Sequence, residues 1–191
     1  MSSVPASAVP GQGKAHHTTD LLVPALGLCA LLVRASLIGS PAATPLFVAI
    51  MVFLALISIA TPVAAGTSPS LSRTVVLIVG VAAVCSTLVL PRAAPLAHTP
   101  LIVAMSIGAA VSEELFFRRL VFGTLVRWGV GVAIVGSAVS FAAVHVPLYG
   151  PAVFGVDLGA GLLFGWQRWA SGNWHASAAT HALANLAAVI R

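Results

Sequence analysis

Two adjacent glutamates, Glu113 and Glu114, lie in the middle of an apolar segment of this 191-residue chain. Neighbouring residues of an α-helix point about 100° apart, so the two carboxylates face different ways. Arg118 follows Glu114 by four residues, on the same helix face and in the order that favours an ion pair. Glu113 has Phe117 at that position and no cation nearby on its own helix. We therefore expect Arg118 to neutralise Glu114, and Glu113 to face a neighbouring helix as a carboxylate without a charge partner, which suits a general base.

Further polar residues recur at the same four-residue spacing on two later apolar segments. Phe141 and His145 stand near the end of one segment, and His181 and Asn185 stand on the last one. Side chains four residues apart share a helix face, so each pair points in one direction. Together with Glu113, these side chains supply a carboxylate, two imidazoles and a carboxamide, the groups needed to activate a water and to stabilise an oxyanion.

A structural role is the alternative for every one of these residues. Both glutamates can pair with Arg118 and Arg119 and hold helices together, because a charge at membrane depth costs about 2.5–3.5 kcal/mol and is usually paired. A histidine or an asparagine can likewise serve a helix–helix hydrogen bond. The presence of the whole set in one chain favours chemistry. The zinc-protease motif His-Glu-x-x-His and a glycine-rich phosphate loop are both absent from the sequence.

The elements that carry these residues belong, by composition, to a membrane protein. Charged residues make up 7% of the chain and hydrophobic residues 59%, whereas a soluble domain has about 25% charged residues. Apolar segments of near-membrane length follow one another along the chain, at residues 21–39, 46–65, 74–90, 101–127, 130–146, 152–170 and 175–190. The sequence therefore predicts an all-α, polytopic transmembrane helical bundle of about seven spans.

We divide the chain into a flexible N-terminal tail (1–20), three leading transmembrane helices (21–98) and a catalytic transmembrane core (99–191) formed by the last four helices. The leading helices are nearly free of ionisable groups apart from Arg34, so we expect a packing half and a chemical half. We expect Asp157, near the start of a helix, to be satisfied by interfacial water or by the helix N-terminus. Three further arginines are expected to contact lipid headgroups: Arg119, Arg127 and Arg168.

Three motifs on successive apolar segments carry a resemblance to a known family. In chain order they are Glu113-Glu114-x-x-x-Arg118, Phe141-x-x-x-His145 and His181-x-x-x-Asn185. They resemble the motifs of the CPBP family of intramembrane proteases, which includes the type II CAAX prenyl endopeptidases and bacterial bacteriocin-processing or immunity proteins. The resemblance covers about residues 99–191, and it implies a helical membrane protease.

The resemblance also implies a role for each motif residue. Glu113 is the water-activating base, helped by His145, while His181 and Asn185 hold the scissile carbonyl oxygen as it becomes negative. The other motif residues support this set: Glu114, Arg118 and Phe141. Family members are described both as metalloproteases and as metal-independent glutamate proteases. Zinc or another divalent metal held by Glu113, His145 and His181 is therefore the alternative to a site without a cofactor. Asn185 favours direct catalysis, because a carboxamide is a poor zinc ligand.

These inferences predict an intramembrane endopeptidase that hydrolyses hydrophobic or lipidated peptides, prenylated CAAX-type tails among them, as a multi-pass protein of the bacterial plasma membrane. The expected partners are the peptide substrate and membrane lipids. Nucleic acid is not expected, because Lys14 and the eight arginines are scattered and form no basic run. Two alternatives remain: a non-catalytic immunity or scaffold protein of the same fold, and a small proton-coupled transporter in which Glu113 titrates.

Overall fold

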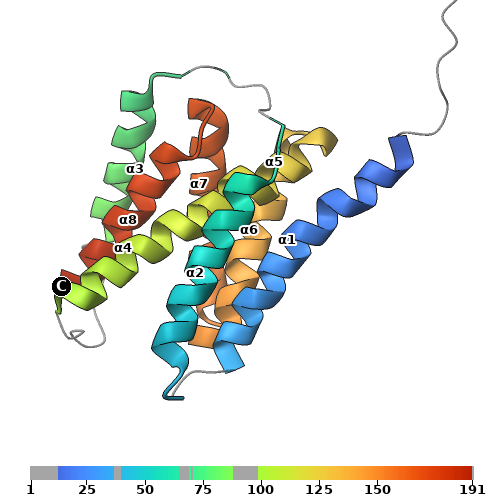
Figure 1. Ribbon diagram of the computed structural model, residues 1–191. Coiled ribbons are helices and arrows are strands. Elements are labelled where there is room, and N and C mark those ends of the chain that lie inside the picture. The colour runs from blue at the N-terminus through green and yellow to red at the C-terminus, as the bar shows by residue number, and fades with distance from the viewer. Residues whose placement is uncertain (1–12, 37–39, 65–68, 70, 88–98, 191) are drawn as a thin grey trace, which may run out of the picture.

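A computed structural model describes residues 13–36, 40–64, 69, 71–87 and 99–190, with side chains from residue 21 onward. Within these ranges the secondary structure is helical throughout (Figure 1). The helices, in chain order, are α1 (Gly13–Ser36), α2 (Ala43–Ala60), α3 (Arg73–Thr87), α4 (Pro100–Glu114), the π-helix η1 (Leu115–Val121), α5 (Phe122–Leu125), the 3₁₀-helix η2 (Val126–Trp128), α6 (Val130–Tyr149), α7 (Val153–Ser171) and α8 (His175–Ile190).

The predicted all-α bundle is confirmed, and each apolar segment of the sequence forms a helix. The segment α4–η1–α5–η2 runs on as one composite helix, Pro100–Trp128. This helix, α2 and α6 are long and apolar enough to cross a membrane, while Leu21–Ser36 and α3 are shorter apolar helices. The first helix begins at Gly13, so residues 13–20 of the predicted tail are helical. Residues 1–12 lie outside the described part.

Local sequence signals set the ends of the composite helix. Thr99 caps its start, because the threonine hydroxyl accepts a hydrogen bond from the backbone N–H of Ile102 at 3.2 Å. Pro100 follows at the first helical position, where its missing N–H costs nothing. At the other end Gly129 has φ +113°, a backbone conformation that side chains other than glycine rarely adopt. The chain turns there into α6.

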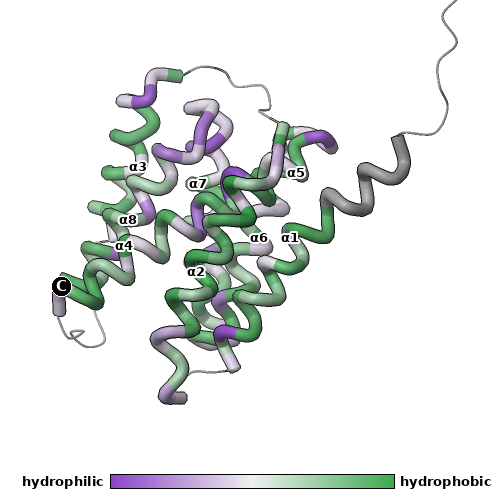
Figure 2. The backbone as a smooth tube through the Cα atoms, in the orientation of Figure 1, coloured by the Kyte–Doolittle hydropathy of each residue, from purple (hydrophilic) through white to green (hydrophobic). Residues whose placement is uncertain are grey.

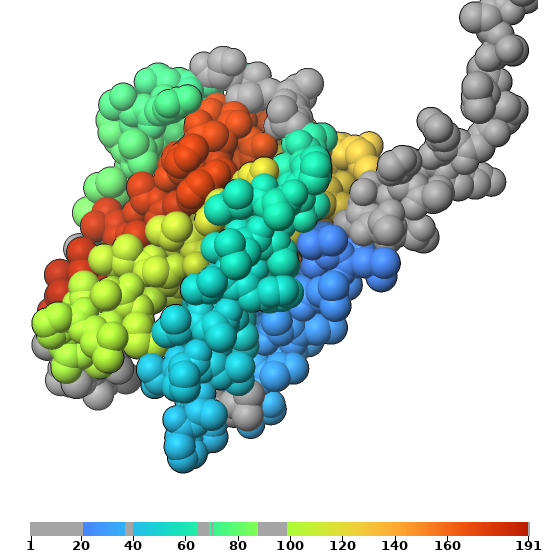
Figure 3. Space-filling view, viewed as in Figure 1, coloured from blue at the N-terminus to red at the C-terminus, as the bar shows by residue number. Residues whose placement is uncertain are grey.

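Two long helix pairs form the centre of the bundle. Figure 1 shows α4 running beside α8, and α6 packs along α7. In front of them α2 lies between α1 and α4, as the space-filling view shows (Figure 3). The core between these helices is largely aromatic, with Phe116, Phe117, Phe141 and Phe164 almost fully buried.

Apolar side chains also cover the outer faces of the helices. Figure 2 shows how many apolar residues, in green, lie along α1, α2 and α3. Leu56 of α2, Ile78 of α3 and Val156 of α7 are 61%, 62% and 72% exposed, respectively. Such surfaces are costly in water but suit the hydrocarbon of a bilayer. They support a membrane location.

Small residues let two helix pairs approach each other closely. A Cβ atom added at Gly161 of α7 would come within 2.9 Å of the backbone Cα of Ala138 on α6. A Cβ at Gly80 of α3 would overlap the side chains of Thr180 and Gln167. Without a hydrophobic force between helices in lipid, such close packing is what holds them together.

The composite helix contains a seven-residue π-helix, η1, directly after the two glutamates. π-helical turns are rare and are often found at functional sites. The Arg168 Nε on α7 donates a hydrogen bond to the backbone carbonyl of Arg118 within this turn, at 3.1 Å. Arg168 is buried, and its guanidinium lies over the ring of Phe122. The expectation that Arg168 contacts lipid headgroups is therefore wrong, because its side chain is used to hold the π-helix.

Candidate active site

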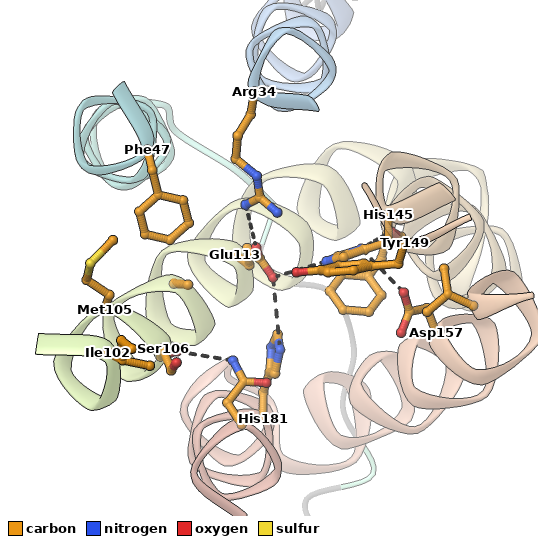
Figure 4. A pocket seen from close by; sticks show the side chains of 14 residues that line it. Arg34, Phe47, Ile102, Met105, Ser106, Glu113, His145, Tyr149, Asp157 and His181 are labelled. Carbon is orange, nitrogen blue, oxygen red and sulfur yellow. Dashed lines mark hydrogen bonds and ion pairs between the residues drawn. The ribbon is translucent and has the colours of Figure 1, made fainter. Parts of the chain in front are cut away.

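The predicted catalytic side chains line one cavity of about 570 Å³ (Figure 4). Glu113 comes from α4, His145 from α6, and His181 and Asn185 from α8. Three separate helices thus bring together the four residues that we expect to be catalytic. The other polar side chains that line the cavity are Arg34, Ser106, Tyr149 and Asp157.

The Glu113 carboxylate lies between the two imidazoles. Its Oε2 atom is 3.9 Å from Nε2 of His145 and 3.9 Å from Nε2 of His181 (Figure 4). These separations are too long for direct hydrogen bonds. All three groups line the same cavity, where a water can bridge polar atoms that do not contact each other directly.

Both imidazoles are oriented by hydrogen bonds at Nδ1. His145 Nδ1 lies 2.7 Å from the backbone carbonyl oxygen of Phe141, and His181 Nδ1 lies 3.1 Å from Oε1 of Glu114. A carbonyl and a carboxylate are acceptors, so Nδ1 carries the proton and donates in each case. Nε2 of each ring is consequently turned toward Glu113.

The ion pair between Glu114 and Arg118 has no exposed side-chain surface. Arg118 Nε lies 3.3 Å from Glu114 Oε2, the pairing that the four-residue spacing predicts. Arg118 Nη2 also donates to the carbonyl of Gly161 on α7, at 3.2 Å. The guanidinium is surrounded by the rings of Phe117, Phe141 and Phe164. This pair joins the composite helix to α7 and, through Glu114, orients His181.

Phe141 separates this ion pair from the cavity. Its ring centroid is 4.6 Å from that of His145 and 5.6 Å from that of His181. On its other side the ring carries the Arg118 guanidinium, 4.8 Å from the centroid. Phe141, which we expected to support the catalytic residues, thus packs against both imidazoles.

Asn185 lies one helical turn beyond His181 on α8. Its Nδ2 donates to the backbone carbonyl of Ser106 on α4, at 3.1 Å. A carboxamide has two N–H donors. The second one therefore remains for a ligand in the cavity that Asn185 lines.

Arg34 corrects one sequence-based expectation. Glu113 was expected to lack a charge partner, yet Arg34 Nη1 lies 3.4 Å from Glu113 Oε1. The two residues are 79 positions apart, and helix periodicity gives no signal for such a contact. The leading helices are therefore not only a packing half, because α1 places a cation in the cavity.

Asp157 and Tyr149 are the other cavity residues that the sequence did not assign to the site. Asp157 Oδ2 lies 3.7 Å from Nδ1 of His145, so this carboxylate faces the cavity. The sequence had instead led us to expect it at the membrane interface. The Tyr149 ring stacks on the His145 imidazole at a centroid distance of 5.9 Å and an angle of 12°. Tyr149 follows His145 by four residues, so helix periodicity could have predicted that these two side chains share a face.

The alternative of a metal centre at Glu113, His145 and His181 finds no support in the geometry. Within the described ranges, no three His, Cys, Asp or Glu side chains are arranged to hold a metal ion. The Arg34 guanidinium lies 3.4 Å from Oε1 of Glu113 and already brings positive charge to this carboxylate.

Residues 95–187 match the family described as type II CAAX prenyl endopeptidase, Rce1-like. The match includes Glu113, His145, His181 and Asn185, with the helices that carry them. This half of the chain belongs to that family. No curated protein and no solved structure matches the chain.

The match supports, at the level of the family, a CAAX-type intramembrane endopeptidase. The three leading helices, including Arg34, precede the matched residues. The four side chains that we predict to be catalytic thus lie within the Rce1-like half, while part of the cavity wall comes from outside it.

Proposed function

We propose that the chain hydrolyses hydrophobic or lipidated peptides, prenylated CAAX-type tails among them, with Glu113 as the general base and no metal ion. The observation that carries this proposal is the meeting of Glu113 Oε2 with the Nε2 atoms of His145 and His181, each 3.9 Å away, in a cavity of about 570 Å³. The apolar outer faces of the helices support a multi-pass protein. A bacterial plasma membrane is expected from the bacterial proteins that share the motifs.

The number of protons around the bound water assigns different roles to the two histidines. A water has two protons to donate, whereas Glu113 Oε2 and two neutral imidazoles would present three acceptors to it. One of the three must therefore carry a proton of its own. We place it on Nε2 of His181, which then keeps its Nδ1 hydrogen bond to Glu114 and gains a donor toward the cavity.

The reaction then proceeds by general base catalysis. The water donates to Glu113 Oε2 and His145 Nε2, its oxygen attacks the scissile carbonyl carbon, and Glu113 takes the proton that leaves the water. The negative oxygen of the tetrahedral intermediate accepts hydrogen bonds from His181 Nε2 and from the free N–H of Asn185. The intermediate collapses as the C–N bond breaks, and Glu113 returns its proton to the leaving amine.

The test is a cleavage assay on the full-length chain in detergent, with a farnesylated peptide that carries three apolar residues after its modified cysteine. Glu113→Gln should abolish cleavage, because an amide keeps the shape of the side chain but cannot accept a proton from water. Arg73→Gln, on the exposed start of α3, is the matched control and should cleave at the parental rate. Undiminished turnover by Glu113→Gln would remove Glu113 from the mechanism. Proton flux into liposomes without cleavage would favour the transporter alternative.

A further inference from the structure

Arg34 is the one lysine or arginine among the described residues that line the cavity. Its contact with Glu113, 3.4 Å between Nη1 and Oε1, is long for a hydrogen bond between two charged groups, which is usually 2.7–2.9 Å. Among the described residues, Glu113 is the hydrogen-bond partner of the Arg34 guanidinium. Since a guanidinium has five N–H donors, most of them remain for a ligand.

The Arg34 guanidinium is also held from one face. The ring of Phe47 on α2 lies against it, with the Arg34 Cζ atom 5.4 Å from the ring centroid. Figure 4 shows both side chains entering the cavity from the side opposite His181. A guanidinium packed on an aromatic ring keeps its N–H edge free, and that edge matches the two oxygens of a carboxylate.

The charges of the cavity define what this edge can bind. Glu113 and Asp157 contribute two carboxylates, which repel an anionic group, and Arg34 is the arginine of the cavity that can hold one. The protonated His181 of the proposed mechanism lies against Glu114 and serves the oxyanion instead. An anion that docks on Arg34 lies next to the base, because Arg34 and Glu113 are in contact. At about 3.5 Å per extended residue, a peptide carboxylate on Arg34 lies only a few residues from the bond that is cut.

We propose that Arg34 binds the free C-terminal carboxylate of the peptide substrate and thereby restricts cleavage to bonds close to a C-terminus. This inference rests on the proposed peptidase function and adds a specificity-determining residue from outside the Rce1-like half. The bound carboxylate replaces Glu113 as the partner of Arg34. Glu113 is then released to take the proton from water, so that binding of the correct terminus prepares the base.

The experiment compares two farnesylated peptides of one sequence, one ending in a free acid and one in an amide. For the unmodified chain, kcat/KM for the acid should exceed that for the amide by roughly 10- to 100-fold, the value of a hydrogen bond to a charged group. In Arg34→Gln the ratio should fall to about one, mainly through loss of activity on the acid. Arg34→Lys keeps the charge without the planar fork and should give an intermediate ratio, while Arg73→Gln should keep the full ratio.

Several results would overturn the inference. A ratio near one for the unmodified chain, or an equal loss on both peptides in Arg34→Gln, would show that Arg34 serves only Glu113. If Arg34 binds a lipid phosphate instead, vesicles with increasing phosphatidylglycerol will change the activity of the unmodified chain but not of Arg34→Gln, with no acid preference in either.

A binding measurement separates this inference from the proposed function and does not depend on the folding of a variant. The thermal stabilisation of the unmodified chain is compared for short apolar peptides with acid and amide termini. Stabilisation by the acid alone, without cleavage of either farnesylated peptide, would refute the peptidase proposal and leave the carboxylate site intact. Equal stabilisation by both peptides would refute the carboxylate site even if both farnesylated peptides are cleaved.

Discussion

Glu113 and Glu114 are adjacent and of one residue type, yet we expect their glutamine variants to differ. Glu114→Gln should lower the thermal stability, whereas Glu113→Gln should abolish cleavage and leave the stability almost unchanged. Glu114 and its partner Arg118 have side chains that are 0% exposed, whereas Arg34, the partner of Glu113, is 12% exposed beside the cavity. Glu114→Gln leaves the Arg118 charge buried without a counter-charge. Glu113→Gln leaves the Arg34 charge within reach of water.

The size of the effect follows from burial. Removing one partner of a fully buried ion pair costs about 3–5 kcal/mol. A protein of 150–250 residues loses about 2–4 °C of melting temperature per kcal/mol, so Glu114→Gln should melt roughly 6–20 °C lower. The Glu113–Arg34 pair borders the cavity and is not fully buried, so Glu113→Gln should cost less stability and melt within a few degrees of the unmodified chain.

The measurement is tryptophan-detected thermal unfolding in detergent, since the chain contains four tryptophans. A double variant, Glu114→Gln with Arg118→Met, provides a control, because removing both charges should restore most of the lost stability. It should not restore peptide cleavage, because His181 still lacks its charged acceptor. Equal melting temperatures for the two single glutamine variants would refute the division between a buried structural pair and a catalytic carboxylate.

Two further predictions concern the oxyanion and the metal. His181→Ala and Asn185→Ala should each lower kcat by about 10²–10³, the usual effect of losing one oxyanion donor, with little change in melting temperature for Asn185→Ala; unchanged kcat in both would exclude them from this role. Dialysis against a strong chelator should leave cleavage unchanged, because the proposed mechanism uses Glu113 as a base without a metal ion. Loss of activity that added zinc restores would show a metal centre instead.

The parts of the site that could be predicted are those that depend on one helix. The four-residue spacings predicted that Glu114 and Arg118 share one helix face, and that His181 and Asn185 share another. In the structure the first two form an ion pair, and the second two line the same cavity. Hydropathy alone likewise defined the helical segments. In both cases the information lies within about 20 consecutive residues, where the period of the helix decides the outcome.

The contacts that could not be predicted join helices far apart in the sequence. Arg34 meets Glu113 across 79 residues, Arg168 reaches the Arg118 carbonyl across 50, and His181 meets Glu114 across 67. Each of these depends on the order in which the helices pack, which hydropathy does not contain. An arginine in an apolar helix is also ambiguous by itself, because it can extend to the lipid headgroups or turn inward.

The π-helix after Glu114 makes the site depend on the number of residues in this segment as well as on their identity. A π turn accommodates more residues than an α turn, so deletion of one residue from Leu115–Val121 would let the backbone return to an ordinary α-helix. The helix would remain long and apolar enough for a membrane. Because the extra residue of a π turn is accommodated locally, the α-helical side chains after the deletion would keep nearly their present direction, while those of the π turn itself would turn relative to the two glutamates. A shortened variant could thus keep its composition and its membrane insertion while losing the contacts that Arg118, inside the π turn, makes with Glu114 and Gly161.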